Sequence, residues 1–349
     1  MMHASSTHSL HVPNYQKESA MRSFRVLAVL VPVFVLAGLI CRPVVAADDA
    51  AKPLKVLLVA GGCCHDYATQ TKLLKKGIES RINAVVEVIY NPDTSVNARF
   101  EIYESDGWAR DFDVVIHDEC SAGVSERPYV DRILKAHHDG VPAVNLHCAM
   151  HSYRWGDFQK AVPADADNAG WFTMIGLQSS RHGPQAPIDV HYAEHPITAG
   201  LADWMTINEE LYNNIQVFPS ATVLASGKQL QQPRRKKGEP ADPEAKPTEA
   251  TAVVAWVSEY GPKQTRVFST SLGHNNETVG DDRYLDLVSR GLLWAAGKLT
   301  DSDKEESGLV ANEQVSESNE NHCVPREPRD GPIQRIRMRR FMRRNARCQ

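Results

Sequence analysis

Residues 55–62 read Lys-Val-Leu-Leu-Val-Ala-Gly-Gly, an apolar run that ends in two glycines. A strand buried on both faces of a parallel sheet has this pattern, and the glycines are typical of the turn that follows it. Residues 69–81 then carry apolar side chains at helical spacing, and residues 84–90 form a second apolar run. The order strand, helix, strand predicts the beginning of an α/β fold.

The same alternation continues along the chain. Further strands are predicted at 113–117, 142–147, 188–192, 221–225, 252–260 and 266–270, and further helices at 127–138 and 284–296. This order predicts a flavodoxin-like fold, which is a mostly parallel sheet with helices on both faces. Residues 227–249 have no apolar periodicity, so we expect a surface loop there.

The N-terminal residues 1–46 are expected to be an extension followed by a signal peptide. Two arginines precede the uncharged run at residues 26–40, and small residues at 44–46 offer a cleavage site. The run is shorter than the ~20 residues of a spanning helix, so we expect no stable membrane span. The protein is then exported, to the periplasm or the medium if it is bacterial. Translation starts at either Met1 or Met21.

The C-terminal residues 301–349 are first acidic and then rich in arginine, with few large apolar side chains. Such a segment cannot bury a core, so we expect a disordered tail. The alternative for its arginine-rich part is a tether to an anionic partner. Residues 47–300 then form one domain.

Composition excludes several classes of protein. The 349 residues are 42% hydrophobic and 23% charged, as in a globular protein, and the net charge of -4 argues against a specific nucleic-acid binder. The seven cysteines are too few for a disulfide scaffold and form no C-x-x-C pair. We expect Cys63, Cys64 and Cys120 to be reduced, because adjacent cysteines are poorly placed to bridge each other. We expect Cys148 to be a buried, inert thiol.

Histidines follow several of the predicted strands, namely His65, His117, His147 and His274. Ligands of open parallel sheets bind at the carboxyl ends of the strands, so we predict that these side chains share a pocket. The alternative is that each is a satisfied loop residue. Clustered imidazoles serve as general acids and bases near neutral pH, or as ligands of a divalent metal such as zinc where a carboxylate joins them. The sequence predicts no other cofactor.

Five segments together carry a resemblance to a known family. They are residues 56–66, 146–153, 178–182, 195–212 and 254–274. The chain resembles the ThuA-like, or trehalose-utilisation, family over roughly residues 54–299, and the resemblance implies a fold like that of class I glutamine amidotransferases. An amidotransferase needs a Gly-flanked cysteine and a late His-x-Glu pair, whereas this chain has His274-Asn-Asn-Glu277, so we do not expect glutaminase activity.

The resemblance also implies site residues. We expect four catalytic residues, which would also hold a metal if one binds: His65, His147, Glu210 and His274. We expect four substrate-binding residues: Asp66, Tyr153, His182 and Tyr212. The motif Glu209-Glu210-Leu211-Tyr212 stands where the family has Asp-Glu-Leu-Tyr.

The implied role is in sugar metabolism. We therefore expect an exported, carbohydrate-active enzyme of hydrolase or isomerase type that acts on a carbohydrate or sugar derivative by His/Glu acid–base or metal-assisted chemistry. The alternative is a non-catalytic carbohydrate-binding module on the same fold. A pure sugar-binding site needs aromatic and amide groups more than imidazoles, which favours the enzyme. The chain could also form a homo-oligomer.

Overall fold

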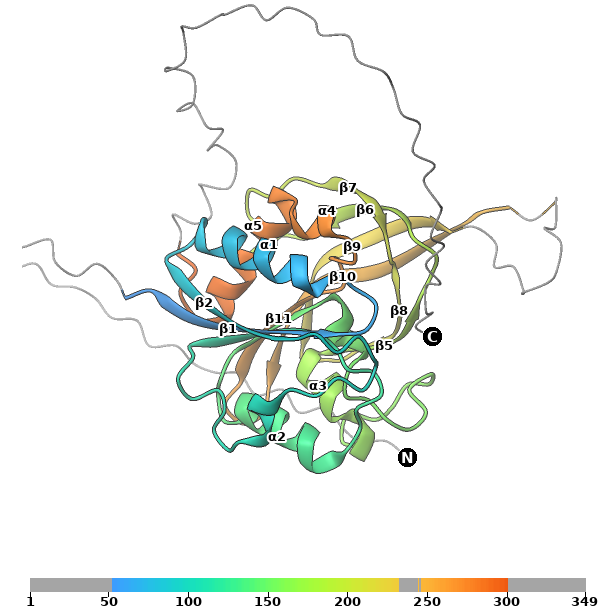
Figure 1. Ribbon diagram of the computed structural model, residues 1–349. Helices are drawn as coiled ribbons and strands as arrows, with labels where there is room; N and C mark the ends of the chain where they lie inside the picture. Colours follow the sequence, from blue (N-terminus) through green and yellow to red (C-terminus); the bar gives the residue numbers. More distant parts are fainter. Residues whose placement is uncertain (1–51, 232–243, 245, 301–349) are drawn as a thin grey trace, which may run out of the picture. The chain divides into compact units, whose positions relative to one another are not determined.

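The computed structural model describes residues 52–231, 244 and 246–300 (Figure 1). The expected signal peptide at 1–46 and the expected tail at 301–349 lie outside the described residues, so the domain boundaries stay predictions. The described strands are β1 (Leu54–Gly62), β2 (Ala84–Asn91), β3 (Val114–Cys120), β4 (Ala143–Leu146), β5 (Leu177–His182), β6 (Ala186–Tyr192), β7 (Trp204–Glu209), β8 (Tyr212–Val217), β9 (Ala221–Gln231), β10 (Thr248–Tyr260) and β11 (Thr265–Thr270).

The described helices vary widely in length. The longer ones are α1 (Tyr67–Glu79), α2 (Arg127–His138) and α5 (Asp282–Ala295), and the shorter ones are α3 (Gly170–Ile175) and α4 (Asn276–Val279). Short 3-10 segments lie at Glu101–Glu104, His147–His151 and Asp167–Ala169. None of the helices within the described ranges is long and apolar enough to cross a membrane.

A nine-stranded sheet forms the centre of the described region, in the order β2-β1-β3-β4-β11-β10-β9-β6-β7. The strands from β2 to β11 in this order run parallel. Strands β1, β3 and β4 are adjacent, which is the flavodoxin-type arrangement. The predicted fold class is confirmed.

Helices cover both faces of the parallel strands, with α1 and α5 on one face and α2 and α3 on the other (Figure 1). The alternating side chains of β1 explain why its sequence is apolar throughout. Val56 and Leu58 pack in the cluster that contains residues of α1 and α5. Leu57 and Val59 pack in the cluster that contains residues of α2 and α3.

The other strands extend the sheet in antiparallel pairing from β11 through β10, β9 and β6 to β7. Strand β9 continues to Gln231 and β10 begins at Thr248, so the predicted surface loop at 227–249 is wrong at both of its ends. The pattern misled because a polar residue faces inward there. Gln229 is buried, and its Nε2 donates to the carbonyl oxygens of Ala186 and Glu209, each at 2.9 Å.

A separate two-stranded sheet of β5 and β8 lies beside this extension. Neither of its strands was predicted from the sequence. The chain between β7 and β8 contains Glu210, so these strands place that carboxylate at the edge where β1, β4 and β11 end.

Candidate functional site

Three histidines meet at the carboxyl end of the parallel strands. His65 follows β1, His147 follows β4, and His274 follows β11. The ring centroid of His65 lies 4.8 Å from that of His147 and 4.6 Å from that of His274, and the His147 and His274 centroids are 5.4 Å apart. Parallel strands bring together residues that are distant in sequence, as the topology rule predicts. We call these rings and Glu210 the histidine cluster.

A tight turn after β1 places His65. Gly61 and Gly62 have positive φ angles of 146° and 96°, and a Cβ at Gly62 would lie 2.2 Å from the carbonyl oxygen of Cys120. Only glycine fits there. The His65 Nδ1 is 3.3 Å from the carbonyl oxygen of His274, which can only accept, so Nδ1 carries a proton. In the neutral ring, Nε2 then accepts from the Cys148 thiol at 3.0 Å.

His147 has a fixed tautomer. It adopts a left-handed φ of 39° directly after β4, and its ring is 2% exposed. Its Nδ1 donates to the carbonyl oxygen of Ser271 at 2.7 Å. In the neutral ring the lone pair is therefore on Nε2, and this atom faces Glu210.

The loop after β11 is held in place by two side chains. Glu209 accepts from the backbone N–H groups of His274 and Asn275, at 3.1 and 3.2 Å. Gln70 in α1 donates through Nε2 to the carbonyl oxygens of Gly273 and His274, at 3.4 and 3.0 Å. These contacts fix His274 from both sides of the loop. The sequence analysis did not identify either role.

Glu210 is the carboxylate of the cluster. Its Oε2 is 3.5 Å from His147 Nε2 and 3.2 Å from His274 Nδ1, and its Oε1 is 3.3 Å from His182 Nδ1. Burial would raise the pKa of the Glu210 carboxyl, but the contacts with His147 and then His274 outweigh it and lower the pKa. Glu210 is therefore ionised at neutral pH. Burial would lower the pKa of His274, but Glu210 outweighs this effect and raises it.

Two nitrogens of the cluster have no hydrogen-bond partner among the described residues, namely His147 Nε2 and His274 Nδ1. Both face the same carboxylate, and with one Glu210 oxygen they lie within 4.8 Å of one another. An unpaired buried nitrogen next to a carboxylate calls for a proton or a cation between them. Two histidines and one glutamate also form a known ligand set of catalytic zinc sites, so these three residues could hold a divalent metal.

Tyr212 lies between two further imidazoles. The His151 ring stacks on it at 4.4 Å, with an angle of 6° between the planes, and the His182 ring lies 5.9 Å away on a plane tilted by 29°. Burial, and next the charge of Arg154, lowers the pKa of His151, which is therefore neutral. His151 was missed from the sequence, although it stands only four residues after His147.

Other predicted site residues lie differently. Asp66 is exposed, caps α1 by accepting from the Thr69 N–H at 3.3 Å, and accepts from Asn276 at 3.0 Å. Tyr153 is fully buried, and its hydroxyl donates to Glu119 at 3.1 Å within the cluster of α2 and α3. The structure therefore does not bring Tyr153 to the histidine cluster.

The expectation that His117 shares the pocket is wrong. Strand β3 does not end at residue 117 but continues to Cys120, and the fully buried His117 ring points into the α2 and α3 layer, where it packs 5.5 Å from the Trp171 ring. Its Nδ1 lies 2.9 Å from Glu119, and its Nε2 lies 2.9 Å from His137. Three polar residues in a row resembled a loop, but here they form a buried network.

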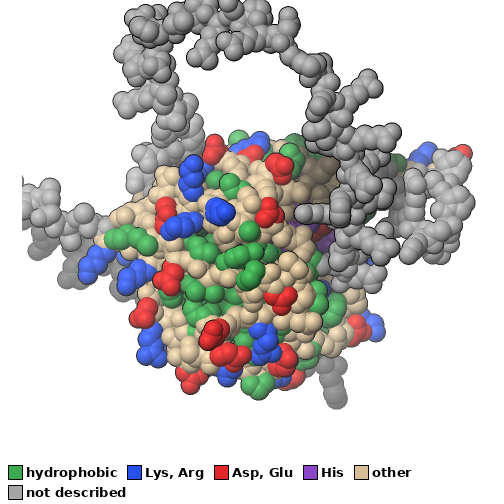
Figure 2. All heavy atoms as spheres, in the orientation of Figure 1, with side chains coloured by type: hydrophobic (Ala, Val, Ile, Leu, Met, Phe, Trp, Pro, Cys, Tyr) green, Lys and Arg blue, Asp and Glu red, His purple; other side chains and the backbone are tan. Residues whose placement is uncertain are grey.

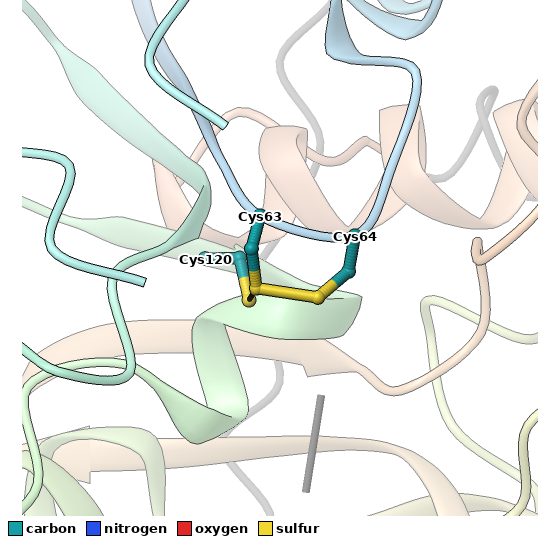
Figure 3. A group of neighbouring side chains, drawn as sticks. All are labelled: Cys63, Cys64 and Cys120. Carbon is teal, nitrogen blue, oxygen red and sulfur yellow. Dashed lines mark hydrogen bonds between the residues drawn. A yellow bond between two sulfur atoms is a disulfide. The ribbon is translucent and has the colours of Figure 1, made fainter. Parts of the chain in front are cut away.

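The expectation that Cys63 and Cys64 are reduced is also wrong, because the structure joins them in a disulfide (Figure 3). The two glycines before them and the left-handed φ of 85° at Cys64 turn the chain enough for adjacent sulfurs to meet. Cys120 and Cys148 are free and buried, as expected for Cys148. Its contact with Cys120, and then its burial, raises the pKa of the Cys148 thiol well above the usual value.

The histidine cluster is partly open to solvent, because 28% of the His182 side chain and 17% of the His274 side chain are exposed. Histidine atoms also reach the molecular surface in Figure 2, on a face where acidic and basic side chains are interspersed. A small polar molecule could therefore reach the imidazoles.

Several solved structures of known proteins are similar to this chain. A ThuA-like protein from Parabacteroides merdae ATCC 43184 is 19% identical, with a TM-score of 0.46 over 71% of this chain and 92% of that chain. A GMP synthase protein from Thermoplasma acidophilum is 11% identical, with a TM-score of 0.37 over 69% of this chain and 96% of that one. The sequence matches no curated protein. The model of the ThuA family, described as trehalose utilisation, matches residues 55–295, and the chain therefore belongs to this family.

Proposed function

We propose that this protein is an enzyme that acts on a carbohydrate or sugar derivative by proton transfer at the histidine cluster, in a reaction of hydrolase or isomerase type. The observation that carries the proposal is the contact of one buried carboxylate, Glu210, with imidazoles from three separate segments: His147, His182 and His274. The family description, trehalose utilisation, supports a sugar as the substrate.

The chemistry follows from the protonation states. The ionised Glu210 stabilises a proton on a facing imidazole, so that the imidazole can act as a general acid and, after donating, as a base. A sugar hydroxyl or carbonyl oxygen at the exposed sides of His182 and His274 would receive or lose that proton. The Tyr212 ring, stacked between His151 and His182, positions both the carboxylate segment and the His182 ring.

A metal-assisted form of the same function uses the same residues. His147 Nε2, Glu210 and His274 Nδ1 would hold the ion, which would supply Lewis-acid polarisation of a substrate oxygen. His65 is outside this set because both of its ring nitrogens already have partners. Its role is to pack against the other two rings and to keep them in place.

A panel of disaccharides and their keto derivatives tests the proposal. The purified chain is stripped with a chelator and assayed with and without added zinc, and sugar binding is measured in parallel by calorimetry. Turnover without zinc supports proton transfer, and turnover only with zinc supports the metal-assisted form. Binding with no turnover under either condition supports the carbohydrate-binding module instead.

Export is a second proposal, which rests on the sequence of residues 22–46 alone. A mature N-terminus near Ala47 or Asp48 in exported material would support it. Full-length chain that stays in the cytosol would contradict it.

A further inference from the structure

Three cysteines meet where β1 and β3 end, beside the histidine cluster (Figure 3). Cys63 and Cys64 form a disulfide, and the Cys63 Sγ lies 3.2 Å from the Sγ of the free Cys120. The reaction proposed for the histidine cluster uses none of these sulfurs. A free thiol in contact with a disulfide sulfur is the starting arrangement of thiol–disulfide exchange.

The backbone holds this arrangement firmly. Gly62 is paired with Cys120 in the parallel ladder between β1 and β3, and the Cys63 N–H donates to the carbonyl oxygen of Cys120 at 3.3 Å. The absence of a side chain at Gly62 allows the two chains to approach this closely. The Cys120 thiol is therefore fixed against Cys63 by secondary structure rather than by a mobile loop.

The three sulfurs differ in access to solvent. Cys63 and Cys120 are only 6% and 2% exposed, whereas Cys64 is exposed. A bond between Cys63 and Cys120 would bury the new disulfide and leave Cys64 as a thiol at the surface. The position of the reactive thiol would therefore depend on which partner Cys63 has.

We propose that Cys63, Cys64 and Cys120 form a thiol–disulfide exchange site. The Cys120 thiolate attacks the Cys63 sulfur, the bond between Cys63 and Cys120 forms, and the bond between Cys63 and Cys64 breaks. Cys64 leaves as a thiolate and takes up a proton in place of the one that Cys120 lost. The chain is neither oxidised nor reduced overall, so no external oxidant or reductant is required.

The exchange makes Cys64 a modification site for small electrophiles and disulfides. In the resting state its sulfur is bonded to Cys63, and only the exchanged state offers a thiol at the surface. Because Cys64 directly precedes His65, a group attached to it would lie next to the histidine cluster. The exchange is nevertheless independent of the sugar chemistry and is tested without any sugar.

Trapping with iodoacetamide tests the exchange in the full chain, purified without a reducing agent. After incubation at mildly alkaline pH, the reagent is quenched and the protein is denatured with a second, isotope-labelled reagent that marks the remaining thiols. Trypsin cleaves at Lys72 and Arg110, so Cys63 and Cys64 share one peptide and Cys120 lies on another. The exchanged state is then a cross-link between two peptides, with the first label on Cys64, and we expect this species to accumulate with time.

Variants assign the step to Cys120. We expect Cys120→Ser to abolish labelling of Cys64 by the first reagent, and Cys148→Ser, a neighbouring buried thiol, to leave the rate of labelling unchanged. Cys64→Ser provides a test that does not depend on the folding of Cys120→Ser, because Cys63 should then bond to Cys120 when a small disulfide is added. The proposal fails if the native chain gives no cross-linked peptide, or if Cys120→Ser labels Cys64 as fast as the native chain does.

Discussion

Two adjacent carboxylates have different roles at the site. Glu209 accepts two backbone N–H groups and thereby shapes the loop of His274, whereas Glu210 faces the imidazoles. A shift of one residue along this segment would exchange the two roles. The site therefore depends on the register of the chain between β7 and β8 as well as on its composition.

At the residue scale, Glu210→Gln should separate catalysis from folding. The amide keeps the shape of the side chain but removes the charge that holds a proton on the facing imidazoles. We expect turnover to fall by about 10²–10⁴-fold, while the melting temperature stays close to that of the native chain. The exposed Glu194→Gln is the matched control and should keep full activity. Full turnover in Glu210→Gln would remove this residue from the mechanism.

The buried His137 predicts a pH dependence of stability. Burial, and then the charge of His117, lowers the pKa of His137 to about 3. Below pH 6.5 the unfolded chain binds a proton that the folded chain does not, so this histidine lowers stability as the pH falls from 6.5 towards 3. Between pH 7 and pH 5 the loss is about 2 kcal/mol.

Urea unfolding at pH 7 and pH 5 measures this effect. We expect His137→Gln to lose about 2 kcal/mol less than the native chain over that interval. The neighbouring His138 is exposed, so His138→Gln should behave like the native chain. Equal losses in the two variants would contradict the assignment.

At the scale of elements, the loop after β11 places His274 through Gly273. Gly273 has a φ of 112°, and a Cβ there would lie 2.7 Å from the Tyr284 hydroxyl. Gly140 has the same φ of 112° but open space around it, because its nearest neighbour lies 3.8 Å away. The pair separates the cost of the backbone conformation from that of the steric contact.

We therefore expect Gly273→Ala to destabilise the fold by about 1–3 kcal/mol more than Gly140→Ala does, because only Gly273→Ala adds the contact with Tyr284. Gly273→Ala should also reduce turnover by displacing His274. Thermal unfolding and activity assays measure the two effects. A similar cost for both variants would mean that Tyr284 moves aside freely.

The strands that could be predicted from the sequence are those whose side chains are buried on both faces. Strand β1 reads as one apolar run for this reason, and the positions of His65, His147 and His274 followed from the strand ends. Strand β8 could not be found, because most of its residues are partly exposed and polar. The parity of β3 was equally hidden, and this is why His117 was misplaced.

Glu210 could not be placed from topology at all. It lies in a short link between two strands of different sheets, and only the family motif indicated it. The disulfide was missed because sequence spacing argues against a bond between adjacent cysteines, whereas the glycine turn that permits it is a property of the backbone.

At the scale of the whole molecule, one hydrophobic cluster spans the parallel and antiparallel parts of the sheet. Val144 and Phe268 from the parallel strands pack in the same cluster as Val190 and Leu224 from the antiparallel strands. Because the two parts share a core, we expect them to unfold together.

Calorimetry together with tryptophan fluorescence and circular dichroism measures this cooperativity. The described region contains Trp204 in β7 and Trp171 in α3, so fluorescence reports on both parts. We expect coincident transitions with all three methods. Two separated transitions would show that the antiparallel strands form an independent unit.

The distance along the chain between the members of the histidine cluster has a consequence for synthesis. His65 and His274 are in contact across 209 residues, and the backbone N–H of His274 binds Glu209 across 65 residues. Contacts of such long range form slowly and late. A nascent chain on the ribosome therefore carries His65, His147 and Glu210 for most of its elongation without a working site, and any sugar chemistry must wait until the loop after β11 has emerged.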